Sequence, residues 1–141
     1  MTNTLQKSGS CLCGRIKVEA KALNPEVHAC HCNMCRAWGG GPSFSLHCGT
    51  EVSFTNEELI SVYRSCDWAE LGFCSNCGSH LFYRSLDNGE YILQPGMFED
   101  DDEFVLNQQI FIDEKPDFYS FANETSNLTG AEVFAQYAEK D

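Results

Sequence analysis

Apolar and polar side chains alternate over short stretches of this chain, and such alternation is typical of β-strands with one buried face. The clearest case is the run from 15 to 20, in which Ile16, Val18 and Ala20 take every second position. Similar short segments, separated by glycine, asparagine or acidic residues, predict further strands. They lie at 27–30, 43–48, 52–54, 59–63, 81–83, 91–93, 105–106 and 109–112. The three segments between 43 and 63 are predicted to be antiparallel strands.

Two places predict helices instead. Residues 34–38 predict a short helical turn, which the run Gly39-Gly40-Gly41-Pro42 would end. Near the end of the chain, Val133, Phe134 and Tyr137 stand at helical spacing within 129–138, which predicts a C-terminal helix. The acidic run 99–103 is interpreted as a solvent-exposed loop, because it lacks the glycine and glutamate offsets of an EF-hand calcium loop. The pattern therefore predicts a mainly β domain with short helices.

Composition adds the expectation of one compact domain spanning 1–141. The chain has 141 residues, of which 43% are hydrophobic, and it contains neither a repeat nor a linker. Its net charge is -12, and its nine lysines and arginines are spread singly, so nucleic acid is not an expected partner. The start lacks the apolar core of a signal peptide, and no run of about 18 apolar residues predicts a membrane span. We therefore expect a cytoplasmic protein, with its oligomeric state left open.

Nine cysteines in a reducing compartment are better explained by metal binding than by disulfides, and their odd number agrees with this. Three of them, Cys30, Cys32 and Cys35, fall within six residues. Thiolates select soft metals, and zinc is the default, because a Cys-x-x-Cys turn can point two sulfurs at one tetrahedral ion. No fourth ligand is obvious nearby. The spacing therefore predicts a catalytic zinc site that keeps one coordination position for substrate or water.

Two further pairs of cysteines could share a second ion, Cys11 with Cys13 and Cys74 with Cys77. Four thiolates saturate a zinc ion, so these pairs predict a closed structural site and leave the chemistry to the three-cysteine site. Cys48 and Cys66 are interpreted as small buried apolar residues, and either could alternatively close the open site. The sequence thus predicts two zinc ions per chain.

Three motifs in this order resemble those of a known family. They are Gly9-Ser10-Cys11-Leu12-Cys13-Gly14, Cys30-His31-Cys32-x-x-Cys35-Arg36 and Phe73-Cys74-x-x-Cys77-Gly78-Ser79. Across residues 8–120, their order and rough separations are similar to those of glutathione-dependent formaldehyde-activating enzymes, a family that includes the centromere protein V domain. The resemblance implies a β-rich, zinc-stabilised Mss4-like fold. It also implies that the first and third motifs hold a structural zinc and the second a catalytic zinc.

The resemblance further implies an activity. This is a carbon–sulfur lyase resembling S-(hydroxymethyl)glutathione synthase, in which zinc activates a small thiol, such as glutathione or an analogue. The thiolate adds to a small aldehyde such as formaldehyde, or leaves it in the reverse direction. The alternative is a non-enzymatic, zinc-stabilised protein-binding module of the same fold, because a fold does not fix a function. Such a module would need only the four-cysteine zinc.

The residues around the open site leave further alternatives. A general acid or base could be any of four histidines, namely His28, His31, His47 and His80. Alternation along an extended segment turns His31 away from the face of Cys30 and Cys32, so we expect a supporting or core role for it. Arg36 could offset a negative zinc–thiolate centre, hold a substrate carboxylate or lie free in solvent.

Overall fold

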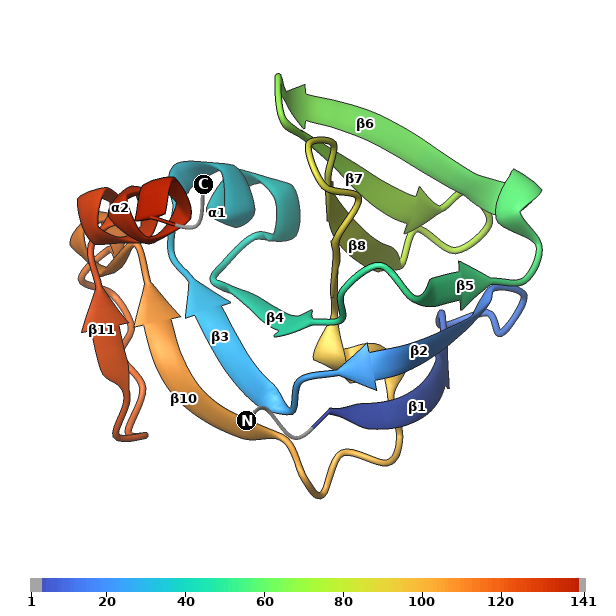
Figure 1. Ribbon diagram of the computed structural model, residues 1–141, viewed down its shortest axis with the longest axis horizontal. Coiled ribbons are helices and arrows are strands. Elements are labelled where there is room, and N and C mark those ends of the chain that lie inside the picture. The colour runs from blue at the N-terminus through green and yellow to red at the C-terminus, as the bar shows by residue number, and fades with distance from the viewer. Residues whose placement is uncertain (1–3, 140–141) are drawn as a thin grey trace. The chain divides into compact units, whose positions relative to one another are not determined.

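The computed structural model describes residues 4–139, and most of its regular structure is β-strand (Figure 1). The chain divides into two compact units, each described by itself. The first runs up to Pro25 and then from Leu46 to Phe104, and the second runs from Glu26 to Ser45 and then from Val105 onward. Within residues 4–139, no helix is long and apolar enough to cross a membrane. That 1–141 forms a single domain stays a prediction.

The first unit contains two groups of antiparallel strands. Strands β1 (Leu5–Ser10), β2 (Lys17–Leu23) and β5 (Val52–Phe54) form a sheet in the order β1-β2-β5. Strands β6 (Ile60–Cys66), β7 (Ala69–Cys74), β8 (His80–Ser85) and β9 (Tyr91–Leu93) each pair with the next. Strand β9 also pairs with Leu46 and His47, the last residues of β4 (Ser43–His47). Single 3₁₀ turns occupy Glu57–Leu59 and Pro95–Met97.

Aliphatic side chains of these strands and of the residues beside them form the core of the first unit. On β2, Val18 and Ala20 are buried while Lys17 is exposed, as the alternation predicts. The largest fully buried aliphatic side chains of this unit are Ile16, Leu23, Leu46, Leu81 and Leu93. Gly72 on β7 lies against the ring of Phe82, where any side chain would collide with the ring. Glycine is therefore needed at this position for the ring of Phe82 to pack across β7.

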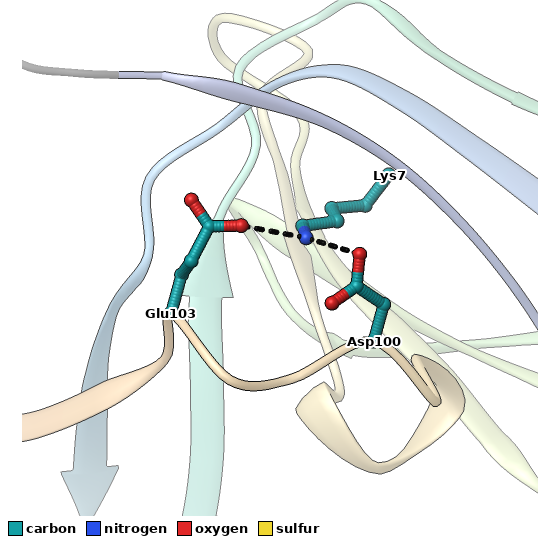
Figure 2. A network of polar contacts seen from close by, with 3 residues as sticks. All are labelled: Lys7, Asp100 and Glu103. Atoms are coloured by element: carbon teal, nitrogen blue, oxygen red, sulfur yellow. Dashed lines mark hydrogen bonds and ion pairs between the residues drawn. The ribbon is translucent and has the colours of Figure 1, made fainter.

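Lys7 takes a buried position on β1, although its type is polar. Its Nζ donates hydrogen bonds to Oδ2 of Asp100 at 2.7 Å and to Oε1 of Glu103 at 2.9 Å (Figure 2). The hydrogen bond to Asp100, followed by that to Glu103, raises the pKa of Lys7 above its ordinary 10.5. The acidic run that carries both carboxylates is an exposed loop, as predicted, and it binds the strand that carries Lys7.

The second unit is built on parallel strands. Strand β3 (Glu26–Cys30) pairs in parallel with β10 (Val105–Ile110), which pairs in parallel with β11 (Ser126–Leu128). The other edge of β3 pairs antiparallel with the first residues of β4, up to Ser45. Helix α1 (Asn33–Gly39) follows β3, a 3₁₀ turn (Ile112–Glu114) follows β10, and helix α2 (Gly130–Glu139) follows β11. Both helices thus lie at the carboxyl ends of the parallel strands (Figure 1).

The predicted mainly β fold with two short helices is confirmed within the described residues. Helix α1 ends at Gly40, whose φ of 88° is the left-handed conformation that glycine adopts without strain. In α2, Val133 is buried, and the ring of Phe134 packs edge-on against the ring of Phe111, with 5.8 Å between the ring centroids. The side chain of Tyr137 lies outside the described residues. The segments predicted at 105–106 and 109–112 both contribute to the single strand β10, which ends at Ile110, so the last two predicted residues lie outside it. Strands β1, β7 and β11 were not predicted.

Candidate metal centres

The sulfurs of Cys11, Cys13, Cys74 and Cys77 all lie within 4.8 Å of one another in the first unit. The sulfur of Cys13 is 3.5 Å from that of Cys11 and 3.9 Å from that of Cys74. Two sulfurs bound at about 2.3 Å to one tetrahedral zinc ion are about 3.8 Å apart, so this donor set fits zinc. The structure therefore brings together the four cysteines that the sequence assigned to one site.

Each pair of this four-cysteine cluster sits in a tight turn closed by a glycine. The amide of Gly14 donates to the carbonyl of Cys11 at 3.0 Å, and that of Gly78 donates to the carbonyl of Cys74 at 2.7 Å. Both glycines have a positive φ, 78° and 79° respectively. Other residue types rarely adopt this conformation, so the glycine after each pair is a local requirement of the turn.

Ser79 joins the two turns of the four-cysteine cluster, and sequence reasoning gave it no role. Its Oγ accepts the amide hydrogen of Leu12 at 3.0 Å and lies 3.2 Å from the sulfur of Cys77. The hydrogen bond from the Ser79 hydroxyl lowers the pKa of Cys77 to about 5. A thiol must lose its proton to bind a metal, so this contact favours the state of Cys77 that binds.

The three-cysteine cluster, formed by Cys30, Cys32 and Cys35, lies in the second unit where β3 leads into α1. Cys30 is the last residue of β3, Cys32 is the N-cap of α1, and Cys35 lies in the first turn of the helix. Their sulfurs lie within 4.8 Å of one another, and the sulfur of Cys32 accepts the amide hydrogen of Cys35 at 3.4 Å. Among the described residues, no histidine or carboxylate joins them. The cluster therefore offers three thiolate ligands.

His31 lies between two of these cysteines but is fully buried and bound elsewhere. Its Nδ1 is 2.7 Å from the hydroxyl of Tyr119, and its Nε2 is 2.8 Å from Oε1 of Gln109. Burial lowers the pKa of His31, and its two ring partners are the hydroxyl of Tyr119 and the amide oxygen of Gln109, neither of them a carboxylate. This buried setting favours the neutral imidazole. Because both ring nitrogens are occupied, His31 is not available as a metal ligand here, and the predicted core role is confirmed.

Two cations lie close to His31, in a unit whose other described charges are negative. Arg36 donates from Nε to the carbonyl of His31 at 2.9 Å, so it is not simply free in solvent. The Nζ of Lys115 lies 5.1 Å from the ring centroid of Tyr119. Described residues of the second unit include no other lysine or arginine. Three thiolates bound to Zn²⁺ would leave a charge of about −1, which these cations would partly offset.

The remaining cysteines and histidines stand outside both clusters. Cys48 is fully buried and its thiol lies 3.4 Å from the carbonyl of Leu46, which confirms its interpretation as a small buried residue. Cys66 is only partly buried, so the same interpretation was wrong for it. Three histidines weighed as acids or bases are likewise not part of either cluster, namely His28, His47 and His80.

Comparison with known proteins gives a consistent result. A family model described as glutathione-dependent formaldehyde-activating enzyme matches residues 6–114. An uncharacterized lyase of Schizosaccharomyces pombe is 36% identical over 127 residues, which cover 89% of this chain and 92% of that protein. The crystal structure of a Rhodobacter sphaeroides protein has a similar fold, with a TM-score of 0.57 at 23% identity over 66% of this chain and 88% of that one. This chain, with its two cysteine clusters, therefore belongs to the family of glutathione-dependent formaldehyde-activating enzymes.

Proposed function

We propose that this protein is a zinc-dependent carbon–sulfur lyase that joins a small thiol to a small aldehyde, or separates them. The family name supports glutathione and formaldehyde as the pair, and the fission-yeast relative is itself named a lyase. The observation that carries the proposal is the three-cysteine cluster, because its nearest histidine is bound on both ring nitrogens. Three thiolates, with no fourth ligand among residues 4–139, suit a metal site that accepts a substrate.

The two clusters would have different roles, one structural and one catalytic. The four-cysteine cluster would hold a saturated zinc ion that ties the turn after β1 to the turn after β7. The three-cysteine cluster would hold the second zinc ion. Zinc held by Cys30, Cys32 and Cys35 would supply the means to keep an incoming thiol as thiolate at neutral pH. Arg36, fixed on the carbonyl of His31, would reduce the negative charge that a fourth thiolate adds.

The reaction at this position is a simple addition. The thiol gives up its proton to solvent, and its sulfur attacks the carbonyl carbon of the aldehyde and forms a carbon–sulfur bond. As the carbonyl π bond breaks, the oxygen takes a proton from solvent and becomes a hydroxyl, so the net change is the addition of the thiol across the carbonyl. In the reverse direction the hydroxyl loses its proton, the carbonyl forms again and the carbon–sulfur bond breaks. The cysteines hold the site in place, and the ring of His31 is kept apart by its own hydrogen bonds.

Exchange NMR on a mixture of glutathione, formaldehyde and their adduct tests the proposal, because it measures both directions without consuming substrate. We expect zinc-loaded protein to accelerate exchange, and Cys32→Ser to abolish the acceleration. Cys66→Ser is the matched control, because it removes a thiol that lies outside both clusters. Equal rates with and without the wild-type protein would reject this activity and favour a binding module, which needs only the four-cysteine zinc.

A further inference from the structure

The backbone amide, the backbone carbonyl and both ring nitrogens of His31 are all hydrogen-bonded. These four bonds fix the position of the residue between Cys30 and Cys32. Its backbone amide donates to the carbonyl of Ile110 on β10 at 3.1 Å, and its own carbonyl accepts from Nε of Arg36 at 2.9 Å. Its ring bonds Tyr119 on one side and Gln109 on the other. The residue joining two of the three thiols is thus fixed from both the backbone and the side chain.

The direction of these bonds follows from the partners of Gln109. The Nε2 of Gln109 donates to Oγ1 of Thr125 at 2.9 Å, and that hydroxyl donates in turn to Oδ1 of Asn127 at 2.7 Å. The amide oxygen of Gln109 therefore faces His31, and an oxygen can only accept. Hence Nε2 of His31 carries the hydrogen, and in a neutral ring Nδ1 accepts from the hydroxyl of Tyr119.

We propose that His31 is a positioning residue of the three-cysteine site. It is held by a chain of hydrogen bonds in which each residue donates to the next. The chain runs through five residues, from Tyr119 through His31, Gln109 and Thr125 to Asn127. This proposal rests on the metal-binding part of the proposed function and not on the reaction itself.

The physical reason is that a tetrahedral metal site tolerates little movement of its ligands. Cys30 is held in β3, and Cys32 is held by the first turn of α1, so His31 alone sets how the backbone passes from one to the other. A buried imidazole that lost a partner would leave an unsatisfied polar atom and would shift to recover it. Such a shift would change the separation of the sulfurs of Cys30 and Cys32. Residues that orient metal ligands typically change metal affinity by about 10–100-fold when replaced.

Cobalt titration of the metal-free protein tests this without any substrate, because thiolate-to-cobalt absorption reports ligand geometry. The binding phase lost in Cys35→Ser belongs to the three-cysteine site. We expect Tyr119→Phe and Gln109→Leu to weaken that phase by on the order of 10–100-fold. The phase of the four-cysteine site should not change, and this serves as the internal control for folding. Tyr63→Phe, at an exposed tyrosine of β6, is the matched control and should behave as wild type.

A conservative replacement separates positioning from general packing. Gln109→Glu keeps an oxygen that accepts from Nε2 of His31, so it should retain more cobalt affinity than Gln109→Leu. Unchanged affinity in both Tyr119→Phe and Gln109→Leu would overturn the proposal, as would equal losses in the Glu and Leu variants. Tyr119→Phe removes only a hydroxyl, so it remains informative if a replacement of Gln109 prevents folding.

The tautomer of His31 gives an independent readout. In nitrogen-15 NMR of the zinc-loaded protein we expect a hydrogen on Nε2 and none on Nδ1. A hydrogen on Nδ1 with a bare Nε2, or a metal bound to either nitrogen, would contradict the chain. Loss of formaldehyde exchange activity alone would affect the proposed function but would leave this result unchanged.

Discussion

The hydroxyl of Ser79 lies 3.2 Å from the sulfur of Cys77, two residues before it, and its oxygen also accepts the amide hydrogen of Leu12. One small side chain thus links the two turns of the four-cysteine cluster, although 67 residues separate Leu12 from Ser79. Thiol spacing alone does not indicate this contact, yet it has a measurable consequence.

We predict that Ser79→Ala destabilises the zinc-loaded protein by about 1–2 kcal/mol, because a hydrogen bond to a thiolate and one to a backbone amide are lost together. Chemical denaturation measures the change. Ser53→Ala is the control, because Ser53 is exposed on β5 and should be neutral. A neutral Ser79→Ala would mean that the two turns are held by the metal alone.

Metal removal should occur in two stages. Four thiolates enclose an ion more completely than three with an exchangeable fourth ligand, so a mild chelator should remove one zinc ion and leave the other. Elemental analysis before and after dialysis measures this, and we expect two zinc ions followed by one. A single tightly held zinc in the fully loaded protein would eliminate the proposed reactive centre.

Cysteine substitutions in the two clusters should differ in kind. Cys77→Ser breaks the site that ties two parts of the first unit together, so we expect low soluble yield or a fall of at least about 10 °C in melting temperature. Cys32→Ser should remain folded but lose one zinc ion and the exchange activity. Melting curves and zinc content measure both, and equal destabilisation by the two changes would contradict the division of roles.

Lys7 should make stability sensitive to alkaline pH. Its pKa is raised above 10.5 in the folded state, chiefly by the hydrogen bond to Asp100 and next by that to Glu103. Its contribution is therefore fully present below 10.5 and is lost as the pH rises through the raised value. We expect the melting temperature of wild type to fall more steeply above pH 10.5 than that of Lys7→Met. Lys17→Met, at an exposed position on β2, should follow wild type.

Short-range patterns in the sequence were sufficient for most local structure. Alternation predicted β2, and the run of glycines after Trp38 predicted the end of α1. Strand β1 was missed for a physical reason. The buried residue of this strand is Lys7, whose charge is paired with carboxylates 93 and 96 positions away in the sequence. Because lysine is polar, its residue type did not indicate that this strand has a buried side chain. Strand β7 was missed because its face is buried at Ala69, Leu71 and Gly72 without regular alternation.

The sequence by itself determined which cysteines group together, because Cys-x-Cys and Cys-x-x-Cys spacing limits which sulfurs can approach one another and glycine closes the turns of the four-cysteine cluster. Only the tertiary structure decided the surroundings of those ligands. The parallel pairing of β3 with β10 places Gln109 within hydrogen-bond distance of His31, although the two are 78 positions apart in the sequence. Tyr119, which bonds the other ring nitrogen, is 88 positions away. Hydrogen bonds between residues so distant in sequence leave no periodic pattern in the chain. They depend on which strands pair, and that is set by packing of the whole unit.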